Sequence, residues 1–134
     1  MINQNYNHPA IVCWGIQNEI MAKFDDVMRP FTEELHNTAK AEDEYRYTVM
    51  ATNHSGAGNW KSDWIAWNVY PGWYGMSRKQ LGWFMDNNRF ERPTGISEYG
   101  AGGNYNQHEL KPKHPKHDGQ WHPEEYQTIS HEAF

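Results

Sequence analysis

The sequence predicts an α/β fold with a parallel sheet. Short β-favouring runs alternate along the chain with segments of helical periodicity, and this alternation is typical of parallel strands joined by helices. The first run, Ile11–Ile16, lacks strict alternation of apolar and polar residues, as expected for a strand covered on both faces. A complete eight-stranded barrel of such units needs about 200–250 residues, so the 134 residues of this chain could hold roughly half of one.

Four strands are expected, each a short apolar run that ends in polar or turn-forming residues. The first covers Ile11–Ile16 and is followed by the polar segment 17–19. The other three are expected at 45–52, 64–70 and 94–99. Within the third, the alternation of a strand places Asn68 and Tyr70 on one face and Trp67 on the other.

The longest helix is expected between the first two strands. Apolar residues recur there at spacings of three and four, which is the stripe of an amphipathic helix. They are Phe24, Val27, Phe31, Leu35 and Ala39. Pro30 interrupts this stripe, and proline is favoured in the first turn of a helix. The regular helix is therefore expected to begin near Pro30 and to run to about Ala41.

Two shorter helices are expected later in the chain. Ser77 with Gln80 forms a capping-box signature before a helix that runs to about Phe90. Pro123 at a first helical position, followed by two glutamates, predicts the start of a last helix. Segment 108–122 between them is polar and broken by prolines, so it is expected to lack regular structure.

The composition excludes several classes of protein. A net charge of −5 argues against a nucleic-acid binder that relies on a basic surface. The single cysteine, Cys13, excludes an intramolecular disulfide framework and a CxxC metal site. No apolar run is long enough to cross a bilayer, and no signal-peptide pattern opens the chain, so the compartment stays open. Aromatic residues make up 15% of the chain and offer amphipathic surface, either to a polar ligand with apolar faces, such as a sugar, or to missing parts of the chain's own fold.

Two carboxylates, Glu19 and Glu98, each end a predicted strand. In α/β barrels the carboxyl ends of the strands carry the active site. Cleavage of a glycosidic bond needs two carboxyl groups, one to protonate the leaving oxygen and one, ionised, to attack or screen the sugar. Spacing alone also allows a second interpretation, in which both are solvated strand-end carboxylates.

Four segments of the chain resemble signatures of glycoside hydrolase family 2, in the family's order. Segment 5–19 (NYNHPAIVCWGIQNE) is similar to the acid/base signature, in which an NHPS-type turn leads into a strand ending in Asn-Glu. Segments 63–74 (DWIAWNVYPGWY) and 92–102 (RPTGISEYGAG) look like the sixth-strand and nucleophile segments. Segment 121–127 (WHPEEYQ) looks like the start of the helix that follows. The extended forms GGNYNQHE and GQWHPEEYQ look most like the β-galactosidase branch known from gut bacteria.

This resemblance implies a partial (β/α)8 TIM barrel, running from about the fourth to just past the seventh strand of the family's catalytic domain. The whole of 1–134 would then be a fragment of that one domain. Half a barrel leaves two open sheet edges, so we expect an isolated chain to be marginally stable, weakly active or inactive, and able to self-associate through those edges.

The activity implied is that of a retaining glycosidase, which cleaves terminal non-reducing β-D-galactosides by double displacement. Three alternatives stay open. They are a β-glucuronidase or β-mannosidase of the same family, a non-catalytic carbohydrate-binding remnant, and a gene fragment without a function of its own. The expected partner is a carbohydrate, with no nucleic acid and no membrane, and the parent protein would belong to the bacterial cytoplasm or periplasm.

The resemblance also assigns roles to three residues of the chain. It implies that Glu98 is the nucleophile, Glu19 the general acid/base, and that Asn18 hydrogen-bonds the 2-hydroxyl of the sugar. Three further substrate-contacting positions follow from it, with Asn68 near the floor of the subsite, Tyr70 beside the nucleophile, and Trp73 either stacking on sugar or packing structurally.

No cofactor is required by this chemistry, and no metal ligand is expected. Some relatives hold a magnesium ion near the acid/base, but the upstream ligand positions are not in this chain. The histidines of 108–122 lack the spacing and the cysteine partners of a zinc site, which favours a solvated loop there.

Overall fold

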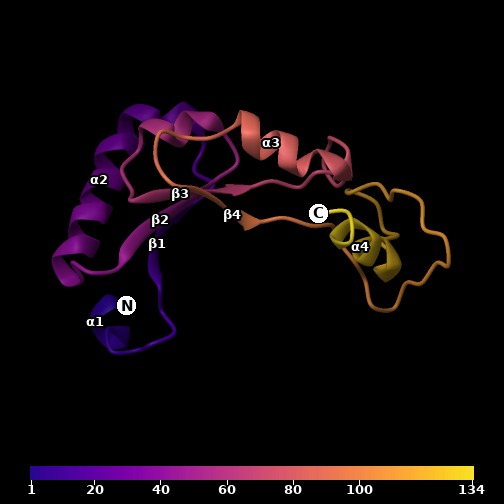
Figure 1. The fold of residues 1–134 in the computed structure, drawn as a ribbon, viewed down its shortest axis with the longest axis horizontal. Helices are drawn as coiled ribbons and strands as arrows, with labels where there is room; N and C mark the ends of the chain where they lie inside the picture. The colour runs from indigo at the N-terminus through magenta and orange to yellow at the C-terminus, as the bar shows by residue number, and fades with distance from the viewer. The chain divides into compact units, whose positions relative to one another are not determined.

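The central feature of the computed structural model is a four-stranded sheet with the order β1-β2-β3-β4 (Figure 1). The structure describes residues 1–134, apart from the side chain of Ala22. The strands are β1 (Cys13–Asn18), β2 (Tyr47–Thr52), β3 (Trp64–Asn68) and β4 (Thr94–Glu98). Both β1 with β2 and β2 with β3 pair in parallel. Neighbours in the sheet are thus neighbours in the chain, as in consecutive units of an α/β barrel, and the predicted fold class is confirmed.

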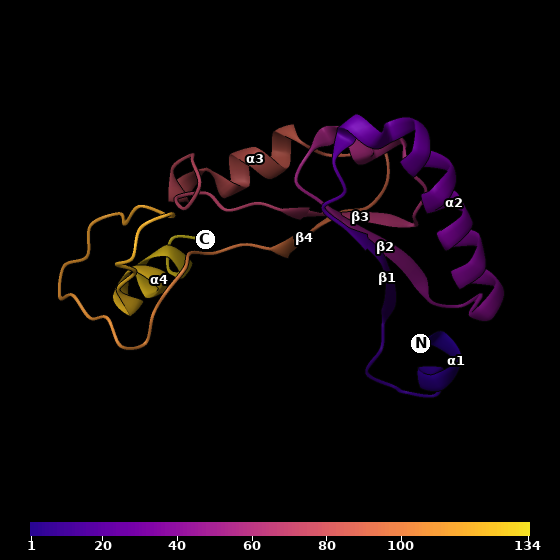
Figure 2. The same cartoon turned by 180° about the vertical axis from the view of Figure 1, so that it is seen from behind.

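Helical segments precede, connect and follow these strands. They are α1 (Ile2–Asn5), η1 (Ala22–Phe24), α2 (Asp25–Glu42), η2 (Ser55–Asn59), η3 (Arg78–Gln80), α3 (Leu81–Asn87) and α4 (Glu124–His131), where η denotes a 3₁₀ turn. Contacts divide the chain into two compact units, the first formed by 1–68 with 89–97 and the second by 69–88 with 98–134. In the first unit, α2 packs against β1 and β2 (Figures 1 and 2). None of the described helices is long and apolar enough to span a membrane.

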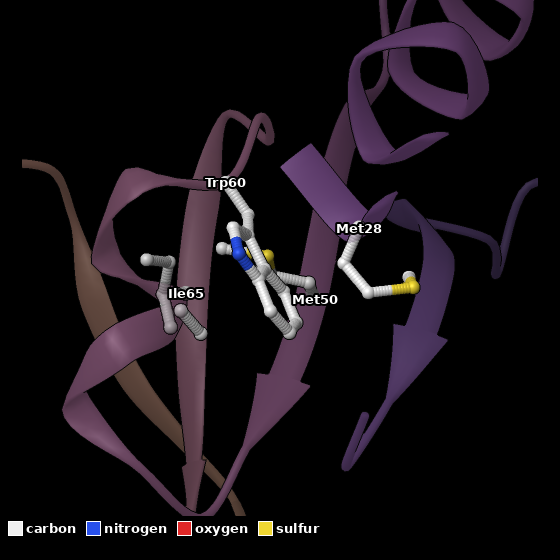
Figure 3. Packing of buried hydrophobic residues seen from close by; sticks show 5 residues of the cluster. Met28, Met50, Trp60 and Ile65 are labelled. Atoms are coloured by element: carbon white, nitrogen blue, oxygen red, sulfur yellow. The ribbon is translucent and has the colours of Figure 1, made fainter. Parts of the chain in front are cut away.

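The core of the first unit lies between α2, η2 and the sheet. Trp60, Met50 and Ile65 are fully buried, and Met28 of α2 packs against the same cluster (Figure 3). Met50 and Ile65 are register partners on adjacent strands, so their side chains share one face of the sheet. The indole N–H of Trp60 donates to Asp25 Oδ1 over 2.5 Å, which satisfies its one polar atom.

The start of α2 differs from the prediction. The helix begins at Asp25, five residues before Pro30, so the proline lies inside the helix rather than at its start. Proline removes one N–H from the helix interior. The first turn is nevertheless held, because Asp25 pairs with Arg29 and accepts the Trp60 hydrogen bond. Its carboxylate also lies at the positive end of the helix dipole.

The predicted buried stripe of α2 is right only at its end, where Ala39 is buried and Leu35 is half-buried. Val27 and Phe31 are exposed, whereas the buried face is displaced along the helix. Its members are Met28, Thr32, His36 and Ala39. The two polar members have partners inside the structure, since Thr32 Oγ1 donates to the Met28 carbonyl over 2.8 Å and His36 contacts Thr48. A buried polar side chain is tolerated when its hydrogen bonds are satisfied. The buried face of such a helix cannot be predicted from the spacing of its apolar residues alone.

Strands β1 and β2 begin two residues later than predicted, and the side chains of Arg46 and Asp43 explain the two shifts. Arg46 Nε donates to the Ile11 carbonyl over 2.8 Å, so the chain before Cys13 bonds to a side chain instead of to the sheet. The carboxylate of Asp43 accepts the backbone N–H groups of Tyr45 and Arg46 over 3.1 and 3.2 Å, which makes a turn where a strand was expected.

The other boundaries are closer to expectation. The capping box of Ser77 and Gln80 is present as predicted, and 108–122 contains no helix or strand among its described residues. Helix α3 ends at Asn87 rather than near Phe90, whose ring stacks on Trp67 with centroids 5.1 Å apart. Pro123 is the N-cap of α4, whereas it was expected to be the first residue of the helix. Strands β3 and β4 end two and one residues early, respectively.

The second unit has a small core of its own. Trp73, Ala101 and Tyr126 are buried together, with Tyr70 partly buried against them. The hydroxyl of Tyr126 donates to the Gly72 carbonyl over 2.6 Å, which ties α4 to the segment that follows β3. This core therefore fixes the loops at the carboxyl ends of β3 and β4.

The buried His36 predicts a pH-dependent stability. Burial is the main cause that lowers the pKa of His36 below its ordinary value, and Nδ1 of the ring lies 2.8 Å from Thr48 Oγ1. Nearby charges act in both directions, since Asp63 raises the pKa whereas Lys40, Lys61 and Arg92 lower it. The folded state thus binds a proton less readily than the unfolded state, so stability is lost as the pH falls through the unfolded pKa of about 6.5.

We expect the urea midpoint of the full-length protein that carries these residues to fall between mildly alkaline and mildly acidic pH. The variant His36→Gln, which cannot titrate, should show a smaller fall over the same range. Exposed His131 supplies a control, since His131→Gln should leave the dependence of the urea midpoint on pH unchanged. If His36→Gln left the dependence of the urea midpoint on pH unaltered, this result would contradict the assignment to His36.

Candidate active site

The first of the two carboxylates, that of Glu19, lies at the carboxyl end of β1. Glu19 follows the strand directly and adopts φ +52°, a left-handed conformation that costs a non-glycine residue about 1–2 kcal/mol. Its backbone N–H still donates to the Ala51 carbonyl over 3.0 Å. Its Oε1 accepts a hydrogen bond of 2.9 Å from Asn68 Nδ2. The carboxylate is therefore fixed at a bend of the chain rather than free in solvent.

Asn68 links three strand ends of the first unit. It is the last residue of β3 and is buried. Its Nδ2 donates to Glu19 Oε1 and also to Asn18 Oδ1, the latter over 3.0 Å. Its Oδ1 accepts a 2.5 Å hydrogen bond from Ser97 Oγ of β4. Because both ends of the amide are used, its orientation is fixed, and with it the position of the Glu19 carboxylate.

The second carboxylate group belongs to the second unit. Glu98 is the last residue of β4, and its Oε2 accepts a hydrogen bond from the hydroxyl of Tyr70. The Glu98 carbonyl accepts the N–H of Val69 over 2.9 Å, so the backbone is held beside the same segment. A hydroxyl that donates to a carboxylate makes a charge-assisted hydrogen bond, which orients the side chain of Glu98.

Two further aromatic residues, Trp73 and Tyr74, follow Tyr70 in the same unit. Tyr74 meets Tyr70 edge to face, with centroids 5.3 Å apart, and is largely exposed. Trp73 is only 7% exposed and packs with Ala101 and Tyr126. The structure thus gives Trp73 a packing role, and its predicted contact with a sugar stays a prediction.

The predicted site residues fall into two sets. Asn18, Glu19 and Asn68 share one hydrogen-bonded network in the first unit, and Tyr70 lies beside Glu98 in the second, as predicted. The meeting of the two glutamates at one bond stays a prediction.

Sequence reasoning missed Ser97, whose hydroxyl holds the amide of Asn68. It also missed Tyr74, although the run of aromatic residues at 73–74 gave a signal for that ring. For Ser97 the only signal was its place directly before Glu98.

The histidines of 108–122 have other partners. His108 lies beside Glu125 and Glu124, and each of the other three lies beside one aromatic ring, in the pairs His114 with Tyr126, His117 with Tyr74 and His122 with Trp73. The hydrogen bond to Glu125 is the main cause that raises the pKa of His108 above its ordinary value. Among the described residues, no three His, Cys, Asp or Glu side chains gather as a metal ion would require.

Comparisons with known proteins identify relatives of the chain. Residues 1–128 match the family model described as glycosyl hydrolases family 2, TIM barrel domain. A β-glucuronidase of Bacteroides fragilis is 42% identical over 134 residues, which is 98% of this chain but 19% of that protein. The chain therefore spans about a fifth of the length of this curated relative.

Solved structures share the fold. The crystal structure of a Bacteroides uniformis β-glucuronidase has a TM-score of 0.80 at 29% identity, covering 100% of this chain and 18% of that one. A Bacteroides fragilis protein provisionally described as a β-galactosidase has a TM-score of 0.82 at 28% identity, covering 98% and 20% of the two chains. Both similarities extend over the two carboxylate groups described above.

Proposed function

Since this chain belongs to glycosyl hydrolase family 2, as part of the family's TIM barrel domain, we propose that it supplies the two catalytic carboxylates of a retaining β-glycosidase. Glu98 is the nucleophile and Glu19 the general acid/base of this proposal. The activity is that of a complete barrel, because the chain spans only 19% of the Bacteroides fragilis β-glucuronidase.

In the first step, a carboxylate oxygen of Glu98 attacks the anomeric carbon while the protonated carboxyl of Glu19 gives its proton to the glycosidic oxygen. The glycosidic bond breaks, the leaving group departs, and a glycosyl ester of Glu98 forms. In the second step Glu19, now ionised, takes a proton from water, and the resulting oxygen attacks the anomeric carbon. The ester bond breaks and returns the Glu98 carboxylate, so the configuration of the sugar is retained.

One observation carries this proposal. A single segment, β3 and its extension, provides a hydrogen-bond donor for each glutamate. Asn68 donates to Glu19, and Tyr70, two residues later, donates to Glu98. A double displacement needs its carboxyls about 5–5.5 Å apart, and this separation is what the proposal predicts for Glu19 and Glu98. The proposed chemistry uses only two carboxyl groups and water, so it requires no cofactor.

For the substrate we favour a β-D-glucuronide. The sequence motifs favoured a β-galactoside, but the curated relative at 42% identity is a β-glucuronidase, which supports the alternative. The β-galactoside stays the second candidate, because the Bacteroides fragilis structure with TM-score 0.82 is provisionally described as a β-galactosidase. The residues that read the 6-position of the sugar are expected outside this segment.

Mechanism-based trapping tests the proposal in the full-length protein that carries these residues. A 2-fluoro β-glucuronyl fluoride and its galactosyl counterpart are each incubated with the protein, and the adduct is located by peptide mass spectrometry. We expect one glycosyl label on the peptide containing Glu98, formed faster with the glucuronyl reagent. Faster labelling by the galactosyl reagent would reverse the choice of sugar.

Two variants complete this experiment. Glu98→Gln should take no label, whereas Glu132→Gln, an exposed carboxylate on the same unit, should label as the parent does. Measurable sugar binding without any label would overturn the enzyme assignment in favour of a carbohydrate-binding remnant.

A further inference from the structure

Figure 1 shows a long loop between β4 and α4, and the sequence of this loop contains several lysines and histidines. Segment 110–117 holds three lysines and two histidines and is flanked by Glu109 and Asp118, whereas the chain as a whole has a net charge of −5. The three lysines are exposed, and they are Lys111, Lys113 and Lys116. A local positive region on an acidic chain attracts anions from solution.

The base of this loop is tied together. The N–H of Asn104 donates to the His122 carbonyl over 2.8 Å. The side chain of Gln107 bridges the two arms, since Nε2 donates to the Gln120 carbonyl over 2.8 Å and Oε1 accepts the His122 N–H over 2.6 Å. Inside the loop, Pro115 is buried between the exposed lysines. The backbone that carries the lysines is therefore closed at its base, while the lysine side chains themselves are exposed.

The loop reaches the predicted nucleophile through two aromatic rings of the same unit. The ring of His117 lies 5.1 Å from that of Tyr74, centroid to centroid. The ring of Tyr74 lies 5.3 Å from that of Tyr70, whose hydroxyl donates to Glu98. The cationic segment is thus separated from the Glu98 carboxylate by two side chains. A ligand that contacts both must extend beyond the sugar attacked by Glu98.

We propose that Lys111, Lys113 and Lys116 bind the carboxylate or sulfate groups of the sugar next to the cleaved bond, on the leaving-group side. The substrate is then an acidic oligosaccharide rather than a small neutral glycoside. This assignment rests on the proposed function, because Glu98 marks the sugar that is transferred. Exposed ammonium groups act as flexible point charges, so the binding weakens with rising salt.

A binding measurement tests this inference without turnover. Isothermal titration is carried out on the full-length protein with a heparin-derived tetrasaccharide, with neutral cellotetraose, and with polyglutamate, at low and high salt. We expect the acidic tetrasaccharide to bind about tenfold more tightly than the neutral one at low salt, and this preference to vanish at high salt. The combined variant Lys111→Ala, Lys113→Ala, Lys116→Ala should lose the preference.

The control variant removes the same charge elsewhere, at Lys23, Lys61 and Lys79, all exposed, and should keep the preference. Equal binding by the loop variant and the parent would overturn the inference. So would equally tight binding of polyglutamate, since that shows simple anion exchange. Failure of Glu98 to take a glycosyl label would refute the glycosidase proposal, yet the affinity measured here would still report on the loop.

Discussion

The variant Glu98→Gln is expected to lose nearly all activity, on the order of 10⁶-fold in kcat, as happens when a hydrolase loses its covalent nucleophile. The amide has the shape of the carboxylate and can still accept the hydrogen bond from Tyr70, so the fold should be kept. It cannot form the glycosyl ester. Initial rates with an aryl β-glucuronide measure the loss, and circular dichroism verifies the fold.

Added azide sharpens this test. In Glu98→Ala the removed side chain leaves room for azide to attack the anomeric carbon once, which gives a glycosyl azide of inverted configuration. Proton NMR of the product identifies the anomer. The exposed carboxylate of Glu132 is the matched control, because Glu132→Gln should keep the parent rate. A retained-configuration azide from Glu98→Ala would show that this residue is not the nucleophile.

The second large effect is expected for Glu19→Gln. General acid catalysis contributes about 10²–10⁴-fold, so kcat/KM should fall by that factor for alkyl glycosides, whose leaving groups need a proton. For activated aryl glycosides the loss in the first step should be much smaller. The geometry should survive, because the amide oxygen of the glutamine can accept the same hydrogen bond from Asn68. Steady-state kinetics over leaving groups of different acidity measures the difference.

The control for this prediction is Glu33→Gln, an exposed carboxylate on α2, which should leave the leaving-group dependence unchanged. Azide again separates the roles. With Glu19→Ala and an activated glycoside, azide attacks the glycosyl ester in the second step, so the product has retained configuration. A uniform loss across all leaving groups would argue that Glu19 acts only as a structural side chain.

The four strands and their approximate positions along the chain were predictable from sequence, because each strand combines an apolar run with a polar end. The capping box at Ser77 was predictable for a similar reason, since its hydrogen bonds are local. The buried face of α2 was not predictable in this way. Thr32 and His36 are buried because of partners on other elements, and such partners do not appear in the periodicity of the helix itself.

In the candidate site, too, contacts within recognisable motifs were predictable and contacts that depend on the packing of separate elements were not. The pairing of Tyr70 with Glu98 followed from recognisable motifs, whereas the bond from Ser97 to Asn68 depends on how β4 lies beside β3. The choice between a galactoside and a glucuronide was also beyond these motifs. They hold the groups that break the bond, and those groups are needed whatever the sugar carries at its 6-position.

The two donors on the segment that begins with β3 have a consequence for how such enzymes can diverge. Asn68 and Tyr70 belong to one continuous piece of backbone, so a one-residue insertion or deletion in β3 would misalign both at once. A change of register in β3 would therefore alter the hydrogen bonds to Glu19 and to Glu98 together, and neither could be adjusted separately in this way. A change of substrate preference through altered length is instead expected in loops outside the strands, such as the loop before α4.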